Sequence, residues 1–242
     1  MEWSDEGIVL GTRRHGETSV ILEVMTLGHG RHLGLVRGGR SRRYQATLQP
    51  GNGVHLTWRA RLDEHLGMFA VEPKVERAGR LIETPLGIHL VQALAGHLRL
   101  LAERDPHHRL FYMLEAMLDH GHSLPLAAGL LVRFELALLE ELGFGLDLSS
   151  CAATGSREAL VYVSPKSGRA VSRAAGEPYA ERMLPLPGFV LADTAGAEPD
   201  PAAVSDGLKL TSFFLSRDVF EPRGLPPPRE RQWIVEKLIA VA

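Results

Sequence analysis

The sequence predicts an α+β protein in which a small five-stranded β-barrel is followed by a helical domain. Within the first 80 residues, five short runs of apolar and β-branched residues alternate with glycine-rich turns. Beyond Pro85, apolar residues recur every three or four positions, which is the period of an amphipathic helix. The oligonucleotide-binding type, or OB-fold, is the commonest five-stranded barrel. We therefore expect an OB-fold domain at residues 1–80 and a helical domain at residues 81–242.

The barrel strands are predicted where apolar residues run together between turn-forming residues. Arg13–Glu17 separates the first two runs and is expected to form a hairpin connection. Val54–Ala60 alternates apolar and polar side chains, as half-buried strands do. The expected strands cover residues 7–11, 18–26, 32–36, 54–60 and 67–72.

The helices are predicted from leucine-rich stripes. Leu86, Leu90, Leu94 and Leu98 repeat every four residues, and similar stripes follow. A β-hairpin is expected inside this helical region, because two apolar runs flank the turn-forming residues 164–169. The expected helices cover residues 86–101, 110–118, 130–142, 208–220 and 230–241, the hairpin strands cover residues 160–163 and 170–172, and a loop covers residues 192–203.

Composition is that of an ordinary globular protein from a reducing compartment. The 242 residues are 45% hydrophobic and 23% charged, with a formal net charge of -2. The single cysteine, Cys151, excludes a disulfide framework within the chain and fits the cytoplasm. The acidic N-terminus is not expected to be a signal peptide, and no apolar run approaches the roughly 20 residues that span a bilayer. We therefore expect a cytoplasmic protein that has no membrane partner.

A local excess of arginine indicates a polyanionic partner. Residues 1–80 hold twelve basic and nine acidic side chains, and no acidic residue lies between Glu23 and Asp63. Arginine binds phosphate through a rigid fork of donors, and each neutralised phosphate releases counterions. Nucleic acid is the favoured partner, with Tyr44 as a surface on which bases stack. Trp58 is either a second such surface or, slightly favoured, a core residue. The candidate DNA-binding arginines are Arg31, Arg37, Arg40, Arg42, Arg43, Arg59 and Arg61.

No catalytic motif is present in the sequence. It lacks the Gly-x-x-x-x-Gly-Lys-Ser/Thr phosphate loop, the Gly-x-Ser-x-Gly motif and the His-Glu-x-x-His zinc motif. The chain is therefore not expected to be an enzyme or to need a cofactor. The alternatives to nucleic acid binding are a solvated arginine turn and a protein-interaction scaffold that binds an acidic partner. An enzyme acting on nucleic acid needs metal-binding carboxylates, and the nearby pair Asp63–Glu64 is expected to be an exposed turn.

An ordered set of segments resembles the RecO family of bacterial recombination-mediator proteins. In the first domain these are Gly7-Ile-Val-Leu, His15-Gly-Glu-Thr-Ser, Glu23-Val-Met-Thr, Gly30-Arg, Val36-Arg-Gly-Gly-Arg-Ser-Arg-Arg and Leu48-Gln-Pro. In the second they are Arg133-Phe-Glu-Leu-Ala-Leu-Leu-Glu-Glu-Leu-Gly-Phe-Gly-Leu-Asp-Leu, Cys151-Ala and Ser164-Pro-Lys-Ser-Gly-Arg-Ala-Val-Ser. Together they cover most of residues 7–175 in the family's order.

This resemblance implies a role in DNA repair and homologous recombination. RecO-like proteins bind single- and double-stranded DNA and anneal complementary strands. With RecR they help RecA to load onto single-stranded DNA coated by single-strand-binding protein, and they do so at the nucleoid without hydrolysing nucleotide. The family motif covers residues 37–43 best. The resemblance also implies that the helical domain captures the acidic C-terminal tail of single-strand-binding protein, with Arg133, near the start of its expected helix, as the candidate contact.

The chain departs from the family at a zinc module that many members carry. Cys151 keeps the first of four cysteines, Thr154 stands where the second would be, and no cysteine lies near residues 164–172. A structural zinc site takes four Cys or His ligands. We therefore expect the hairpin to form without metal.

Overall fold

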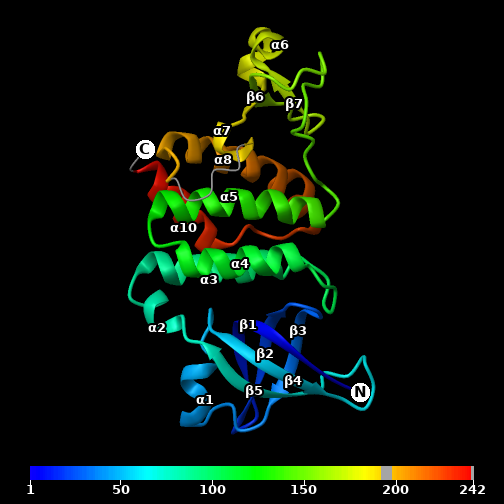
Figure 1. The fold of residues 1–242 in the computed structure, drawn as a ribbon, viewed down its shortest axis with the longest axis vertical. Helices are drawn as coiled ribbons and strands as arrows, with labels where there is room; N and C mark the ends of the chain where they lie inside the picture. The colour runs from blue at the N-terminus through cyan, green and yellow to red at the C-terminus, as the bar shows by residue number, and fades with distance from the viewer. Residues whose placement is uncertain (192–197, 241–242) are drawn as a thin grey trace. The chain divides into compact units, whose positions relative to one another are not determined.

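The computed structural model describes residues 1–191 and 198–240 and divides the chain into two compact units, residues 1–120 (unit 1) and 121–242 (unit 2). Unit 1 holds a β-barrel and the helices that follow it, and unit 2 holds further helices and a small sheet (Figure 1). The α+β class is therefore confirmed. In the described part of the chain, no helix combines the length and the apolar character that crossing a membrane requires.

Unit 1 is built on a closed barrel with the strand order β1-β2-β3-β5-β4. Neighbouring strands are antiparallel, except that β3 and β5 run parallel. The strands are β1 (Glu2–His15), β2 (Ser19–Thr26), β3 (Gly30–Val36), β4 (Gly53–Arg59) and β5 (Met68–Val75). Each of the five predicted strands is present, and the OB-fold is confirmed.

Alternate residues of each strand fill the barrel interior. Leu22, Val24, Leu56 and Phe69 are buried there, as half-buried strands with a period of two require. Trp58 is fully buried among them and donates its indole N–H to the carbonyl of Leu66 (3.1 Å). This confirms Trp58 as a core residue, so it offers no surface on which a base stacks.

Strand β1 extends beyond the predicted residues 7–11 in both directions. Its first half pairs with β4 and its second half with β2, and the register shifts between Val9 and Gly11. Such an irregularity bends a strand and lets β1 serve two neighbours. The polar residues at both ends of β1 belong to the strand because their backbone is paired, which hydrophobicity does not reveal.

A short helix, α1 (Arg42–Thr47), lies between β3 and β4 where the sequence predicts only a basic turn. Its inner side carries Tyr44 and the buried Thr47, and the next residue, Leu48, enters the barrel core. With little more than one turn, the helix is too short to show a period in the sequence.

Helices α2 (Ala78–Leu81), α3 (Pro85–Leu98) and α4 (His108–His120) belong to the same compact unit as the barrel. Thr84 caps α3 by accepting the N–H of Gly87 (3.1 Å). Arg77, just after β5, is buried and donates from Nε to Asp119 of α4 (2.7 Å). This hydrogen bond lowers the pKa of Asp119 below its ordinary value and attaches α4 to the end of the barrel.

Unit 2 is built around three packed helices, α5 (Leu124–Glu141), α8 (Pro201–Phe214) and α10 (Arg229–Ile239). The predicted hairpin is confirmed as β6 (Leu160–Val163) and β7 (Ala170–Ser172), and β8 (Leu184–Pro185) joins the other edge of β6. The shorter elements are α6 (Arg173–Gly176), η1 (Glu177–Arg182), α7 (Gly188–Leu191), the π-helix η2 (Leu215–Phe220) and α9 (Glu221–Arg223).

Two predicted helix starts in unit 2, near residues 130 and 208, differ from the structure. Helix α5 begins at Leu124 rather than near residue 130, because Ser123 accepts the N–H of Leu126 and caps the helix. Helix α8 begins at Pro201, capped by Asp200, so the predicted loop 192–203 is too long; its residues 192–197 lie outside the described residues. The predicted end of the last helix, residue 241, also lies outside them.

A buried ion pair joins α5 to α10. Arg231 donates from Nε and Nη2 to the two carboxylate oxygens of Glu135, at 2.6 and 2.9 Å. The Glu135 side chain is 0% exposed and that of Arg231 7%. Burial works against the charge of Arg231, but Glu135 outweighs it and raises the pKa of the guanidinium. The two charges therefore stabilise each other inside the helical core.

The hairpin of unit 2 is held by contacts within the protein. The backbone N–H of Ser172 lies 3.2 Å from the Sγ of the buried Cys151. Arg217 of η2 donates to the carbonyl of Pro165 in the hairpin turn, and its guanidinium lies 4.8 Å from the ring centre of Phe214. In the described residues, no group of three His, Cys, Asp or Glu side chains is arranged to hold a metal ion.

Replacing Gly30 with alanine is expected to destabilise unit 1 more than the same change at Gly16. Both residues have a left-handed backbone, with φ of +64° and +61°, so each change costs roughly 1–2 kcal/mol in conformation. At Gly30 an added Cβ would also lie 1.9 Å from the carbonyl oxygen of Asp105, whereas at Gly16 it would meet no atom within 4 Å. We expect an extra loss of roughly 1–3 kcal/mol at Gly30, measured by urea unfolding. Equal losses would contradict the close approach of Asp105.

Candidate nucleic-acid interface

The arginine-rich segment that follows β3, residues 37–43, is called the basic loop here. Its backbone leaves Val36 through Gly38 and turns into α1. The N–H of Arg40 donates to the carbonyl of Thr18 (3.0 Å), and its guanidinium donates to the carbonyl of Glu17. Both acceptors lie in the turn between β1 and β2, so the basic loop is attached to that turn.

The four arginines of the basic loop are exposed and carry unopposed charge. Arg37, Arg40, Arg42 and Arg43 are all exposed. Within residues 1–191 and 198–240, no carboxylate lies within ion-pair distance of any of them. The Arg43 guanidinium lies 5.6 Å from the ring centre of Tyr44, and that ring packs partly buried against the barrel core. Tyr44 therefore has only part of its ring available to a base.

Two further arginines, missed in the sequence, stand at the same end of the barrel. Arg13 and Arg14 are exposed at the end of β1, within residues that the sequence assigns to a hairpin connection. Arg14 is opposite Val20, and Val20 is opposite Val36, which immediately precedes the basic loop. The register thus brings Arg14 and Arg37 to one edge. The sequence does not show that β1 continues to residue 15. Only this paired extension of β1 aligns Arg14 with the basic loop.

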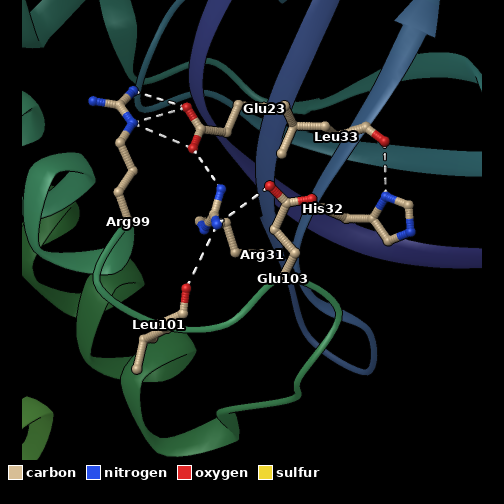
Figure 2. Close-up of polar contacts among 7 residues, drawn as sticks. All are labelled: Glu23, Arg31, His32, Leu33, Arg99, Leu101 and Glu103. Carbon is tan, nitrogen blue, oxygen red and sulfur yellow. Dashed lines mark hydrogen bonds and ion pairs between the residues drawn. The ribbon is translucent and has the colours of Figure 1, made fainter. Parts of the chain in front are cut away.

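Arg31 does not join the exposed arginines. Its side chain is 12% exposed, and it forms ion pairs with Glu23 of β2 (3.1 Å) and with Glu103 after α3 (3.4 Å). Figure 2 shows the Arg31 guanidinium enclosed by these carboxylates and the carbonyl of Leu101. Arg31 thus connects the segment after α3 to the barrel through these contacts.

Arg59 and Arg61 lie at and after the end of β4. Arg59 donates to Glu2 (2.8 Å), and this exposed hydrogen bond lowers the pKa of Glu2 and raises that of Arg59. Its charge is therefore partly opposed. Arg61 is exposed in the loop between β4 and β5, which also contains the exposed pair Asp63–Glu64. Strand pairing places Arg59 beside the start of β1, whereas Arg13 and Arg14 are near its other end.

A cleft of about 490 Å³ opens on the outer face of β1, β2 and β3. Arg99, just after α3, borders it and is 46% exposed. Its Nε donates to Oε1 (3.2 Å) and Oε2 (3.0 Å) of Glu23, and its Nη2 donates to Oε2 (2.8 Å). In Figure 2 Arg99 and Arg31 approach the same Glu23 carboxylate. The cleft is lined by Leu10, Gly11, Thr12, Arg13, Ile21, Glu23, Leu33, Pro50, Gln92 and Arg99.

Arg133, the candidate contact for a protein tail, lies in the middle of α5 because that helix begins earlier than predicted. It is half-buried and donates to the carbonyl of Phe189 in α7. This hydrogen bond uses one of the five N–H donors of a guanidinium. The side chain thus has a structural contact as well as a part that solvent reaches.

Comparison with known proteins agrees with this architecture along both units. Residues 1–73 match the family model for the N-terminal part of recombination protein O, and residues 97–225 match that for its C-terminal part. The DNA repair protein RecO of Chelativorans sp. (strain BNC1) is 61% identical over 233 residues, which cover 96% of this chain and 93% of the relative. The DNA repair protein RecO of Methylobacterium nodulans is 58% identical and covers 97% of both chains. This chain therefore belongs to the RecO family of DNA repair proteins.

Proposed function

We propose that this protein is a non-enzymatic recombination mediator that binds single- and double-stranded DNA and anneals complementary strands. With RecR, it helps RecA to load onto single-stranded DNA coated by single-strand-binding protein in the bacterial cytoplasm. The observation that carries the DNA-binding part is the set of four exposed arginines in the basic loop, none with a carboxylate partner among the described residues. Their attachment to the β1–β2 turn aligns them with Arg13 and Arg14.

The mechanism follows from phosphate neutralisation. Arginines on a barrel edge contact the DNA backbone rather than the base edges, so binding is largely independent of sequence. Each contact releases counterions, so affinity falls steeply with salt. Two complementary strands repel each other in solution, and a surface that neutralises both lowers this repulsion and promotes pairing. This step makes and breaks no covalent bond.

Annealing of complementary oligonucleotides precoated with the cognate single-strand-binding protein tests this proposal. The protein is titrated without nucleotide at two salt concentrations. We expect it to accelerate annealing, and the acceleration to fade at the higher salt. Folded protein that gives no acceleration and does not bind plain oligonucleotide at physiological salt would favour a protein-interaction scaffold with an acidic partner.

Replacing Arg133 with alanine is expected to weaken binding of the C-terminal tail peptide of single-strand-binding protein about tenfold, because a hydrogen bond to a charged group contributes roughly 1.5–3 kcal/mol. Fluorescence anisotropy of a labelled peptide measures this. Arg133→Lys serves as the matched variant: it keeps the charge and should retain part of the affinity. A peptide that binds Arg133→Ala as tightly as the unchanged protein would place the tail site elsewhere.

A further inference from the structure

The cleft beside Glu23 has the features of a ligand site rather than of a packing defect. Its volume of about 490 Å³ falls in the range of roughly 300–1,000 Å³ of small-molecule sites. Its lining combines apolar side chains, among them Ile21 and Leu33, with the polar side chains of Thr12 and Gln92. Apolar walls with a few polar groups are suited to a flat, partly polar ligand such as a nucleobase.

Two arginines supply positive charge to this cleft. Arg13 is exposed and forms no ion pair within residues 1–191 and 198–240. Arg99 is half-exposed and is held by Glu23, a carboxylate that Arg31 also binds (Figure 2). Glu23 therefore binds two guanidiniums, those of Arg31 and Arg99. A phosphate could replace Glu23 as the partner of Arg99, because Glu23 would still be paired with Arg31. Among the lining residues, the charges of Arg13 and Arg99 outweigh that of Glu23, so the cleft is net positive.

The cleft continues the proposed DNA-binding surface. Arg13 lines it and is followed by Arg14 and by the β1–β2 turn to which Arg40 is bonded. A strand bound by the basic loop and by Arg14 would therefore reach the cleft along β1. A base in a duplex is stacked and paired, and it enters such a cleft only after unstacking, whereas a base in a single strand is already free to do so.

We propose that this cleft binds one unstacked nucleotide of a single DNA strand, with the base against Ile21 and Leu33 and the phosphate on Arg13 and Arg99. This inference rests on the proposed function and adds a discrimination between single strands and duplex. The basic loop binds both forms through phosphate, whereas the cleft binds only the single strand. One base of a strand bound in this way is unstacked, and it lies next to the basic loop, the surface proposed to promote annealing.

Disulfide crosslinking tests where the base lies. The only cysteine, Cys151, is buried, so Gln92→Cys adds a single reactive thiol in the cleft. Ala70→Cys, exposed on the outer face of β5, is the matched control. With an oligonucleotide that carries one thiol-tethered base, we expect the crosslink yield at residue 92 to exceed that at residue 70 at least severalfold. The same oligonucleotide annealed into a duplex should give little product at either residue.

Two charge variants test the phosphate contact by titration of labelled single strand and duplex. Arg99→Ala is expected to lower single-strand affinity about tenfold, the effect of one charged hydrogen bond, and to leave duplex affinity within about twofold. Glu23→Gln frees Arg99 and should raise single-strand affinity, whereas a carboxylate needed only for folding would lower both affinities. Because Glu23 also holds Arg31, thermal melting of each variant accompanies the titrations.

The outcomes separate the two proposals. If the unchanged protein binds neither form of DNA, the proposed function fails and this inference fails with it. If it binds DNA but crosslinks equally at residues 92 and 70, or loses single-strand and duplex affinity equally on Arg99→Ala, the cleft inference alone is overturned.

Discussion

Replacing Arg231 with methionine is expected to lower the free energy of unfolding of unit 2 by about 3–5 kcal/mol, the effect of removing one member of a buried ion pair. Glu135 is fully buried, and both of its carboxylate oxygens accept hydrogen bonds from Arg231. Methionine fills much of the same volume but cannot donate. The carboxylate then either stays charged in the helical core or binds a proton, and both cost free energy.

Hydrogen exchange of α5 and α10 measures this effect, because these helices lose protection as unit 2 opens. The double variant Arg231→Met/Glu135→Leu is the control, since it removes both charges and leaves apolar side chains in their place. We expect it to recover most of the lost protection. If the double variant were as unstable as Arg231→Met, the packing of the arginine side chain and not its charge would be what stabilises the helices.

Replacing Arg40, Arg42 and Arg43 together with alanine is expected to lower DNA affinity about 10- to 100-fold at moderate salt. Three lost phosphate contacts should also reduce the slope of log affinity against log salt by about 2 to 3 for duplex DNA. All three side chains are exposed. Their loss removes no ion pair found in the described residues. It does remove the hydrogen bond from the Arg40 guanidinium to the Glu17 carbonyl, but the backbone N–H of residue 40 still bonds to Thr18, so the fold should be kept.

The matched control removes the same charge from unit 2. Arg157, Arg173 and Arg182 are exposed there, and their replacement with alanine changes the net charge by the same amount. We expect this control to have a much smaller effect on affinity and slope, measured by fluorescence anisotropy over a series of salt concentrations. Equal effects would mean that total charge governs binding and that the basic loop has no special role.

The strands and the main helices could be predicted because each buries an apolar stripe of sufficient length. Helix α1 could not, since six residues show no period and its inner side is recognisable only once Leu48 enters the barrel core. The start of α5 was missed for another reason: Leu124 and Leu126 in its first turn are two residues apart, which is not a helical spacing, and the start is set by the cap at Ser123. Packing against the barrel core therefore defines α1 and a local cap defines the start of α5, and neither shows as a hydrophobic period in the sequence.

For the candidate DNA-binding arginines, the sequence shows where the charges are but not which of them form ion pairs in the folded protein. Arg31 and Arg37 look alike in the sequence, yet Glu103, seventy-two residues beyond Arg31, partners it in the structure. Arg14 was missed because its alignment with Arg37 depends on strand register across three strands. Which arginines remain exposed is thus a property of the folded chain.

The ion pairs of unit 1 also determine where this chain can be shortened. A fragment that ends at residue 80, where the strands give way to helices, loses Asp119 and Glu115 and leaves the buried guanidinium of Arg77 without an acid. It also uncovers the part of β1 against which α3 packs. A fragment that ends at residue 120 keeps all of these partners. Limited proteolysis should therefore release a stable piece near residue 120, and that piece is the smallest portion expected to carry the basic loop in its native shape.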